Sequence, residues 1–564
     1  MLFEVITIAA LGLPIVPPTI GLTTTHSPAA QQLAAVERIQ EKTTPTPTIP
    51  STETLEKNGA IIGEITFLIK DIFDPTNPKE SGALYRLVNK LHINTKPSTV
   101  SDLLLFKTGD PFTALSLAES ERILRSQRFI FDARIRPIAY ANNVVDIEVI
   151  TTDVWTLGIS FHYGREGGQN RTSYELRDSN LLGSGKELRV QRTANVDRTE
   201  TTFGYHDPNT ASNHGDLDIE YSDNSDGLNK LISMRRPFIS LESTWSYSTL
   251  FNQNERTDSV YTNGEISDYY HHHLELYEAS LGYSAGIINN KTKRWTFGFT
   301  SKTDFYSVID QTNDADILPL DSKLVYPWIS FDVVENNFIK TRRIDFINRT
   351  EDLNLGQSYN IKLGWSDKDL HAYSNTLLYE THYSIGYKPT ENQLYLSELH
   401  ILGQLTEGHS DNLNINTITK FYYPFLPNQV FHYKLDIEIA RNADSANQIM
   451  LGGDTGLRGY PLRIQEGDRK VLFTLEHRFY TDWHVLQLMY VGGALFFDIG
   501  RAWGSDAPPG PNSGVLKDVG FGLRLSSSRA SKGKVLHIDY AFPMDGDGAT
   551  VDKYQFNVVT EATF

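Results

Sequence analysis

The chain has 564 residues, more than one small domain requires, so we expect at least two structural units. Its formal net charge of −17 argues against a surface built to bind the phosphates of nucleic acids. Cysteine is absent, which excludes disulfide bonds and thiolate chemistry and is compatible with a location in the cell envelope.

The longest apolar stretch lies at the start of the chain, between Val5 and Leu22, and three prolines interrupt it. A membrane-spanning helix needs about 20 apolar residues, and prolines inside the stretch would break it. We therefore predict a signal peptide over residues 1–30, with small residues at Ala29 and Ala30 for cleavage. Residues 31–58 include a run rich in threonine and proline, which predicts an extended linker.

Residues 59–154 combine strand and helix patterns and predict one compact α+β domain. Ile61–Ile72 has the composition of a strand, and Ser81–Leu91 and Thr113–Gln127 have the spacing of helices. Two further strands, Arg128–Pro137 and Val144–Val149, flank a turn that contains two asparagines. The expected order of elements is therefore β-α-α-β-β.

From residue 155 onward the helical periodicity disappears, and short segments alternate between apolar and polar residues. In Phe431–Ile439 and Val471–Phe479 the odd-numbered positions are mostly apolar and the even-numbered ones mostly polar. Side chains on a strand point alternately to its two faces, so each segment has one apolar and one polar face. A soluble β-sandwich gives the same alternation, so the pattern alone does not distinguish a sandwich from a barrel.

Three further features favour a transmembrane barrel. The strand-like segments continue for about 400 residues without a helix. Aromatic residues such as Trp503, Tyr554 and Phe564 stand on the apolar parity near strand ends, as expected at a membrane interface. Short connections alternate with long ones between the last strands, which is typical of outer-membrane barrels.

A glycine-rich motif, LGGDTGLRGYP, occupies Leu451–Pro461. Other distinctive stretches are NLLGSGKEL at Asn180–Leu188, RRPF at Arg235–Phe238, EDLNLG at Glu351–Gly356, FFDIG at Phe496–Gly500, GFGLRL at Gly520–Leu525 and a C-terminal signal residue, Phe564. In this order they resemble the BamA/TamA-type outer-membrane assembly superfamily, which also contains the two-partner secretion transporters. The unit at residues 59–154, with LLFKTGDPF and ESERILR, resembles a POTRA domain, the periplasmic module of that family.

The resemblance implies a mainly β protein: a sixteen-stranded transmembrane β-barrel over residues 155–564, preceded by one N-terminal α+β POTRA domain. It places the glycine-rich motif in an outer loop between the eleventh and twelfth strands, and in this family that loop folds back into the lumen. Arg458, Gly459 and Tyr460, with Gly452 and Gly453, would then form a motif inside the lumen. The glycines would permit the tight return of the chain.

Arg458 is the residue for which we expect the clearest partners. The resemblance implies acidic residues on the inner wall, and strand alternation puts Glu476 and Asp498 on the polar faces of neighbouring strands. A guanidinium group can bind either carboxylate, or both, through paired hydrogen bonds. The alternative is an ordinary solvated arginine in a glycine-rich hairpin.

Catalytic and metal motifs have little support. Asp454–Gly456 spells an aspartic-protease triplet, but that chemistry requires a second triplet. The consecutive His271–His273 would point to alternate faces of a strand, and Asp545–Gly548 lacks the bidentate acid of a calcium loop. Arg122 and Arg125 could bind a substrate or a lipid head group, although a solvated helix face is the simpler interpretation. We expect no enzyme activity, no metal and no cofactor.

These observations predict a protein of the Gram-negative outer membrane whose POTRA domain lies in the periplasm. We expect it to assemble or insert outer-membrane proteins, or to translocate polypeptides, after capturing chains by strand addition. Its partners would be unfolded outer-membrane or secreted polypeptides, the lipid bilayer, and periplasmic or lipoprotein accessory factors, but not nucleic acid. The alternative is a passive pore or surface structural barrel without insertase activity. Family assembly factors usually carry several POTRA domains and two-partner transporters two, whereas this sequence has room for one.

Overall fold

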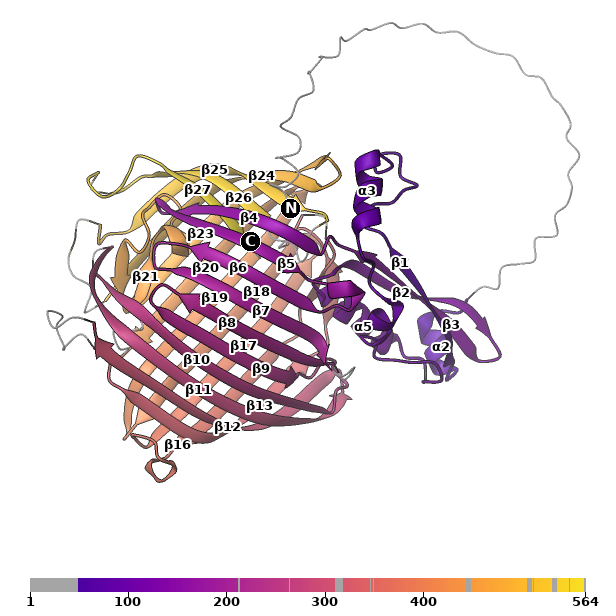
Figure 1. The fold of residues 1–564 in the computed structure, drawn as a ribbon, viewed down its shortest axis with the longest axis horizontal. Coiled ribbons are helices and arrows are strands. Elements are labelled where there is room, and N and C mark those ends of the chain that lie inside the picture. The colour runs from indigo at the N-terminus through magenta and orange to yellow at the C-terminus, as the bar shows by residue number, and fades with distance from the viewer. Residues whose placement is uncertain are drawn as a thin grey trace, which may run out of the picture.

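The computed structural model describes residues 49–561, apart from residues 211–213, 263, 310–317, 345, 348, 443–447, 505–509, 511, 530–534 and 547. The predicted signal peptide, most of the predicted linker and Phe564 lie outside the described residues. Figure 1 shows two parts, a small α+β region and a large barrel of strands. Among the described residues, no helix has both the length and the apolar character needed to cross a membrane.

The N-terminal region, residues 49–154, is built on a three-stranded sheet in the order β1-β3-β2. β1 (Ile61–Lys70) runs parallel to β3 (Val144–Asp153), and β2 (Ile130–Ala141) runs antiparallel to β3. The helices described here are α2 (Thr52–Lys57), α3 (Ala83–Leu91), α4 (Pro97–Ser101) and α5 (Ala114–Ser126). The expected strands and the two longer helices are present. α2 lies within the stretch predicted as linker and contributes the buried Leu55 to the core.

Local sequence determines where these elements begin and turn. The Thr113 side chain accepts a hydrogen bond from the Ser116 backbone N–H at 3.1 Å and caps the start of α5. Asn142 and Asn143 adopt φ values of 52° and 62°, the left-handed conformation that a two-residue hairpin requires, and they join β2 to β3. The region therefore folds around its own apolar core.

Beyond residue 154 the chain forms a closed antiparallel barrel, in which the described residues make twenty strands (Figure 1). In chain order these are β4 (Leu157–Glu166), β5 (Gln169–Asp178), β6 (Glu187–Ala194), β7 (Thr199–Thr210), β8 (Gly215–Asn224), β9 (Gly227–Arg236), β10 (Trp245–Thr262), β11 (Glu265–Ile288), β12 (Lys291–Val308), β13 (Ser322–Glu335), β16 (Ser358–Ser366), β17 (Thr376–Thr390), β18 (Gln393–Thr406), β19 (His409–Leu426), β20 (Gln429–Arg441), β23 (Arg469–Val485), β24 (Met489–Trp503), β25 (Leu516–Ser527), β26 (Val535–Pro543) and β27 (Gln555–Glu561). Two short hairpins lie within the connections: β14 (Phe338–Thr341) with β15 (Glu351–Asn354), and β21 (Ile449–Leu451) with β22 (Gln465–Gly467).

The prediction of sixteen strands is wrong. That number came from the family resemblance and not from the residues, and it allowed about 26 residues for each strand with its connection. The structure instead places ten strands between Leu157 and Glu335, because tight turns follow β4, β8 and β10. The loop that contains Arg458 therefore lies between the fifteenth and sixteenth strands, β20 and β23, and not between the eleventh and twelfth. Five strands follow this loop in both cases, so the additional strands all precede it.

The two faces of the barrel wall differ in the way that the alternation predicts. On β24, Leu495 is 53% exposed on the outer face, whereas Asp498 is 0% exposed and faces inward. Other exposed apolar side chains on the last strands are Phe431, Leu475, Phe521 and Tyr540. An outward apolar band of this kind is what meets the hydrocarbon of a membrane.

Among the last strands, the connections at the two ends of the barrel differ in length. The near end is the one that contacts the N-terminal region, and the far end is the opposite one. The last strands are joined by a short turn at the near end, residues 486–488, and by long loops at the far end, residues 442–468, 504–515 and 544–554. One near-end connection is also long: residues 336–357, the inlet segment, which link β13 to β16 and contain β14 and β15.

The inlet segment joins the N-terminal region to the interior of the barrel. On one side, Arg125 of α5 pairs with Asp352 of β15 at 2.8 Å. On the other side, Ile344 and Ile347 pack in a buried apolar cluster with Tyr480 and other residues of the wall. The N-terminal region is therefore fixed to the barrel through a segment that itself enters the barrel.

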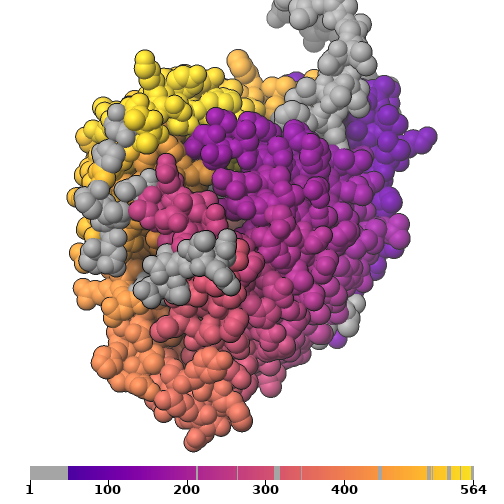
Figure 2. Space-filling model, turned by 60° about the vertical axis from the view of Figure 1, so that its left-hand side comes forward, coloured from indigo at the N-terminus to yellow at the C-terminus, as the bar shows by residue number. Residues whose placement is uncertain are grey.

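The barrel closes between its last strand, β27, and its first strand, β4; we call this contact the seam. Among the described residues, Val558 and Arg165 are the single registered pair across it. Every other pair of neighbouring barrel strands registers at least seven pairs. Figure 2 shows the purple first strands beside the yellow last strands. The seam is thus the shortest registered contact of the wall.

Candidate functional site in the barrel lumen

The far-end connection between β20 and β23 folds back into the barrel, and we call its residues 449–467 the lumen loop. The two ends of the loop pair as the short β21–β22 hairpin. After β21 the chain makes a 3-10 turn at Gly453–Thr455. Leu451, Leu457 and Tyr460 are fully buried and pack against Leu472 and Leu516 of the wall. Burial of these apolar side chains therefore stabilises the position of the loop independently of its polar contacts.

Close backbone contacts explain two of the glycines in the lumen loop. A Cβ on Gly453 would lie 2.5 Å from the carbonyl oxygen of Tyr460 and 2.7 Å from the Cα of Gly167, in the turn between β4 and β5. A Cβ on Gly452 would lie 2.3 Å from the backbone N of Arg463. Clashes with backbone atoms are not relieved by rotating a side chain, so both positions require glycine.

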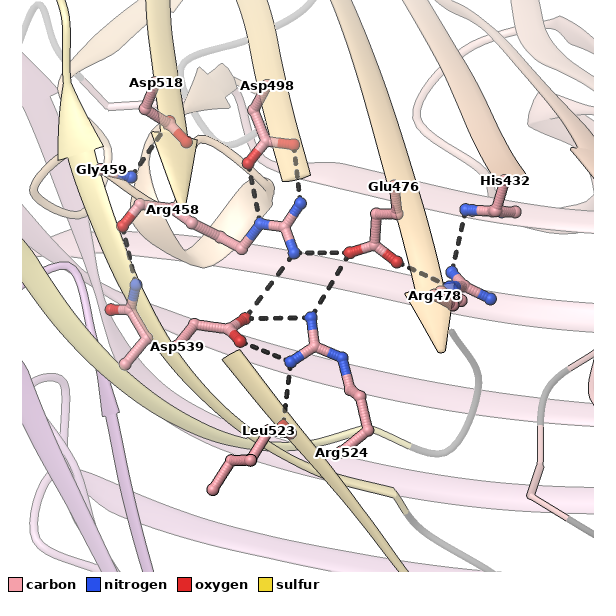
Figure 3. Close-up of polar contacts among 11 residues, drawn as sticks. His432, Arg458, Gly459, Glu476, Arg478, Asp498, Asp518, Leu523, Arg524 and Asp539 are labelled. Carbon is pink, nitrogen blue, oxygen red and sulfur yellow. Dashed lines mark hydrogen bonds and ion pairs between the residues drawn. The ribbon is translucent and has the colours of Figure 1, made fainter. Parts of the chain in front are cut away.

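Arg458 reaches from the lumen loop to two strands of the inner wall (Figure 3). Its Nε and Nη2 donate to the two carboxylate oxygens of Asp498 on β24, at 2.7 and 2.9 Å. Its Nη1 donates to Glu476 Oε1 on β23 at 2.6 Å. Its guanidinium carbon lies 3.5 Å from the centre of the Phe496 ring, which adds a cation–π contact. The planar fork thus binds two carboxylates at once, and the single ammonium of a lysine cannot reproduce this geometry.

Two further arginines share these acids, as Figure 3 shows. Arg478 donates to Glu476 Oε2 at 2.7 Å, and Arg524 pairs with Asp539 and lies 3.5 Å from Glu476 Oε1. Both arginine side chains are almost fully buried. The carboxylates of Glu476, Asp498 and Asp539 therefore each lie beside a guanidinium group, which offsets the cost of burying them. We call these residues the lumen cluster: Arg458, Glu476, Arg478, Asp498, Arg524 and Asp539.

The residues that follow Arg458 fix the lumen loop beside the seam. The Gly459 backbone N–H donates to Asp518 at 3.0 Å, and the Tyr460 hydroxyl donates to the Lys517 carbonyl oxygen at 2.7 Å. The Asn557 side chain, on β27, donates to the Arg458 carbonyl oxygen at 2.7 Å. Because Gly453 lies against the turn that follows β4, the loop contacts β27 on one side of the seam and this turn on the other.

The structure places the residues that the sequence singled out in one site. Arg458 contacts both Glu476 and Asp498, and the other four residues of the predicted motif lie in the same loop, whereas Phe564 lies outside the described residues. The sequence analysis missed Arg478, Arg524 and Asp539. A signal was available, because each of these residues stands on the polar parity of its strand, as Glu476 and Asp498 do.

Two of the three consecutive histidines have separate acidic neighbours. His272 lies 3.0 Å from both Asp258 and Asp304, whereas its neighbour His273 lies near two glutamates, so the histidines do not converge. Within the part of the chain that the structure describes, one group has the spacing of metal ligands: His206, Asp216 and Asp218. Arg235 already donates two hydrogen bonds to Asp216 there.

The interpretation of Arg125 as part of a solvated helix face is wrong. Its side chain is 6% exposed, and it pairs with Asp352 of the inlet segment and with Glu121 of its own helix. Arg122 lies on the same side of α5, with its guanidinium carbon 3.8 Å from the centre of the Phe338 ring. Both arginines therefore dock the N-terminal region onto the barrel.

The chain is similar to one protein family and to several solved structures. The Omp85 superfamily domain matches residues 180–564, and a search of curated proteins gives no match. Solved structures that are similar include BamA from Haemophilus ducreyi lacking POTRA domains 1–3, at 14% identity, with 89% of this chain and 84% of that chain covered and a TM-score of 0.39. CdiB from Acinetobacter baumannii is 11% identical, with 89% and 74% covered and a TM-score of 0.44. CdiB from Escherichia coli is 10% identical, with 88% and 75% covered and a TM-score of 0.42. Because the family domain spans more than half of the chain, the protein belongs to the Omp85 superfamily of outer-membrane β-barrels, which serve in protein transport and assembly.

Proposed function

We propose that this protein inserts outer-membrane proteins or passes polypeptides across the outer membrane, and that the seam between β27 and β4 is where its barrel parts. The observation that carries the proposal is the single registered pair across the seam, Val558 with Arg165. Backbone hydrogen bonds between strands hold a barrel closed, so the shortest registered contact is the one that separates most readily. A client strand can then add to the parted edge through backbone hydrogen bonds.

The lumen loop would control this step. It contacts Asn557 of β27 and Gly167 of the turn after β4, and Arg458 anchors it to two wall strands further from the seam. With the loop seated, the two sides of the seam are held at a fixed separation. Release of Arg458 from Glu476 and Asp498 would free both sides.

We further propose that residues 59–154 are a POTRA domain that lies in the periplasm, so that the near end of the barrel faces the periplasm and residues 155–564 span the membrane. The outer strands of its sheet are β1 and β2. Glu121 and Arg125 bond the edge of β2, and residues 109–112 pair with β1 at Ile61 and Ile62, so the part of β1 after Ile62 would receive an extended chain by strand addition. The folding of the client would supply the free energy. A passive pore remains the competing function, and it requires no movement at the seam.

A reversible crosslink across the seam tests the proposal, because the native chain contains no cysteine. Registered partners on neighbouring antiparallel strands lie within the Cα separation that a disulfide spans. We expect oxidised Arg165→Cys/Val558→Cys protein to lose client assembly in reconstituted vesicles and to recover it on reduction. The matched control is Leu475→Cys/Phe497→Cys, a registered pair between β23 and β24 that should leave assembly unchanged.

Full assembly by the oxidised seam variant would contradict a parting seam. Depletion of the protein in cells provides the second measurement. Loss of particular barrels or secreted proteins from the outer membrane supports assembly, whereas an unchanged protein profile with altered permeability supports the pore.

A further inference from the structure

Helix α3 (Ala83–Leu91) presents an apolar side that the other residues described in the structure do not cover. Leu84, Leu87 and Leu91 recur at the three- and four-residue spacing that aligns side chains along one side of a helix, and each is more than half exposed. No residue of α3 is classed among the buried core, although most helices of soluble domains bury such a side. Exposed leucines arranged in this way indicate contact with a partner or a membrane.

The contacts of α3 fix it beside the wall of the barrel at the near end. The Tyr85 hydroxyl donates to the carbonyl oxygen of Leu486, in the turn between β23 and β24, at 3.0 Å. Just before the helix, Glu80 pairs with Arg529, which follows β25, at 2.8 Å. In Figure 1 α3 accordingly stands next to the end of β24. These two contacts place the helix at the near-end rim of the barrel.

The end of β23 and the turn after it, which α3 contacts, are apolar and exposed. Trp483, Val485 and Leu486 are all exposed, and Trp483 is 69% exposed. They continue the outer apolar band of β23, to which Leu475 and Phe479 belong, to the near-end rim. A tryptophan at this level is typical of the boundary between the hydrocarbon and the head groups. The leucines of α3 thus lie next to a surface that meets lipid.

Two basic residues complete the pattern. Arg86 and Lys90 lie one turn apart on α3, and both are exposed. Lys90 lies one turn from Leu87 and borders the leucine stripe, whereas Arg86 lies beyond Lys90 and donates to the Ser81 carbonyl oxygen. An apolar stripe flanked by basic side chains is the composition of helices that lie in the plane of a membrane interface. In such helices the basic groups reach the lipid phosphates while the apolar side chains enter the acyl boundary.

We infer that α3 is an interfacial membrane helix, which binds the lipid leaflet at the near end of the barrel and so holds the N-terminal region against the membrane. The orientation rests on the proposed function, because it makes the near-end leaflet the periplasmic one. Continuity with the apolar band of the barrel favours lipid over a polypeptide partner. An incoming client chain, or residues 1–48 of this chain, are the other occupants that the test separates.

A single fluorescent label tests the inference, since any introduced cysteine is unique. An environment-sensitive dye on Leu87→Cys in the full chain, reconstituted into vesicles of phosphatidylethanolamine and phosphatidylglycerol without a client, should emit at shorter wavelength than in water. Bromine on the lipid acyl chains should quench it several-fold more than the same dye on Ile138→Cys. Ile138 is the matched control, because it is also apolar and exposed but lies on β2 of the same region.

A dye at Lys90→Cys should be quenched by a head-group quencher more strongly than by acyl-chain bromine, because Lys90 lies beside the stripe and not within it. Water-like emission from Leu87→Cys would overturn the inference. Short-wavelength emission that lipid bromine does not quench would also overturn it, since protein would then cover the stripe. The assay contains no client, so a failure of assembly activity leaves its outcome unchanged.

Discussion

The Arg125 guanidinium and the Asp352 carboxylate, 227 positions apart in the chain, form two parallel hydrogen bonds of 2.8 Å each. Arg125 belongs to α5 of the N-terminal region, and Asp352 belongs to the inlet segment of the barrel. Their side chains are 6% and 16% exposed, so the pair is largely removed from solvent. Paired bonds from one fork fix orientation as well as distance. The N-terminal region is thereby held at a defined angle to the barrel.

Replacement of Arg125 by alanine should loosen this docking. Loss of one partner leaves a poorly solvated charge on the other, and such truncations cost about 2–5 kcal/mol. We expect faster amide hydrogen exchange in α5 and in the inlet segment, while exchange in strands β16–β20 stays unchanged. Arg136→Ala is the matched control, because Arg136 is about half exposed and pairs with Glu148 at the surface. Equal effects of the two variants would show that the Arg125 pair does not fix the docking.

Replacement of Arg458 by alanine should destabilise the lumen loop more than replacement by lysine. Alanine leaves Glu476 and Asp498 short of a buried partner, at a cost of about 3–5 kcal/mol, whereas lysine keeps the charge but loses the fork. Thermal unfolding in detergent and protease cleavage within residues 449–467 measure the difference. Lys388→Ala serves as the control, since its partner Glu391 is 93% exposed. If the alanine and lysine variants behave alike, the geometry of the fork has no role.

The docking of the N-terminal region should depend on pH through Glu121. Burial alone would raise the pKa of Glu121, but a hydrogen bond from the Ile135 backbone N–H and contacts with Lys340 and Arg125 outweigh it and lower the pKa. A lowered pKa in the folded state stabilises the fold above the unfolded value of about 4.3, and this stabilisation is lost as the pH falls through the folded value. Glu121→Gln should therefore destabilise the docking at neutral pH, and the difference from the native protein should vanish in acid.

Glu119, two residues away, provides a control of opposite sign. Burial raises the pKa of Glu119, despite the hydrogen bond from the Leu241 backbone N–H and the nearby charge of Arg122. A raised pKa means that the ionised carboxylate reduces stability at neutral pH, and that the stabilising contribution is confined to lower pH. Glu119→Gln should not destabilise the docking at neutral pH. Urea unfolding of the N-terminal region, followed across the pH range at a single label, tests both variants, and a loss of stability in both would contradict the assignment.

Replacement of Gly453 by alanine should separate the lumen loop from the first barrel hairpin. The added Cβ would meet the Tyr460 carbonyl oxygen and the Gly167 backbone, neither of which can rotate away. We expect slower oxidation of the Arg165→Cys/Val558→Cys pair in this background, because the seam loses its inner support. Gly158→Ala, on β4, is the control for introducing a Cβ, since the nearest atom there is the Ser160 hydroxyl at 3.8 Å, an ordinary contact distance. Unchanged crosslinking in Gly453→Ala would show that the loop does not support the seam.

Strand alternation alone was sufficient to predict which side chains face the lumen. The inward direction of Glu476 and Asp498 follows from their even positions in the alternation. A shift of register by one residue would turn every apolar side chain of the strand to the wrong face. Arg478, Arg524 and Asp539 obey the same parity and could have been found in the same way. Phe496 could not, because it is an apolar residue on the polar parity, and only the position of Arg458 above its ring explains it.

The number of strands was not available from the residues. The turns after β4, β8 and β10 span only a few residues. The alternation of apolar and polar residues is also weak in the first half of the barrel, so the two strands of each hairpin could not be distinguished in the sequence. Non-local contacts were also hidden. Nothing in the ESERILR motif indicates that Arg125 finds its partner in the inlet segment, because that pairing exists only after the barrel has closed.

The inlet segment lies between the two polar sites of the molecule. Asp352, on β15 of this segment, binds Arg125 of α5. The Ile344 carbonyl oxygen of the same segment accepts a hydrogen bond from Arg478. Arg478 also binds Glu476, which is a partner of Arg458. Suppose that binding of the lumen loop to the wall through Arg458 changes the affinity of the inlet segment for α5. Docking of α5 must then change the equilibrium constant for binding of the loop by the same factor, because coupling free energies are reciprocal. A polypeptide that binds at the near end of the barrel would thereby change the stability of the lumen loop, which enters from the far end, without passing through the barrel.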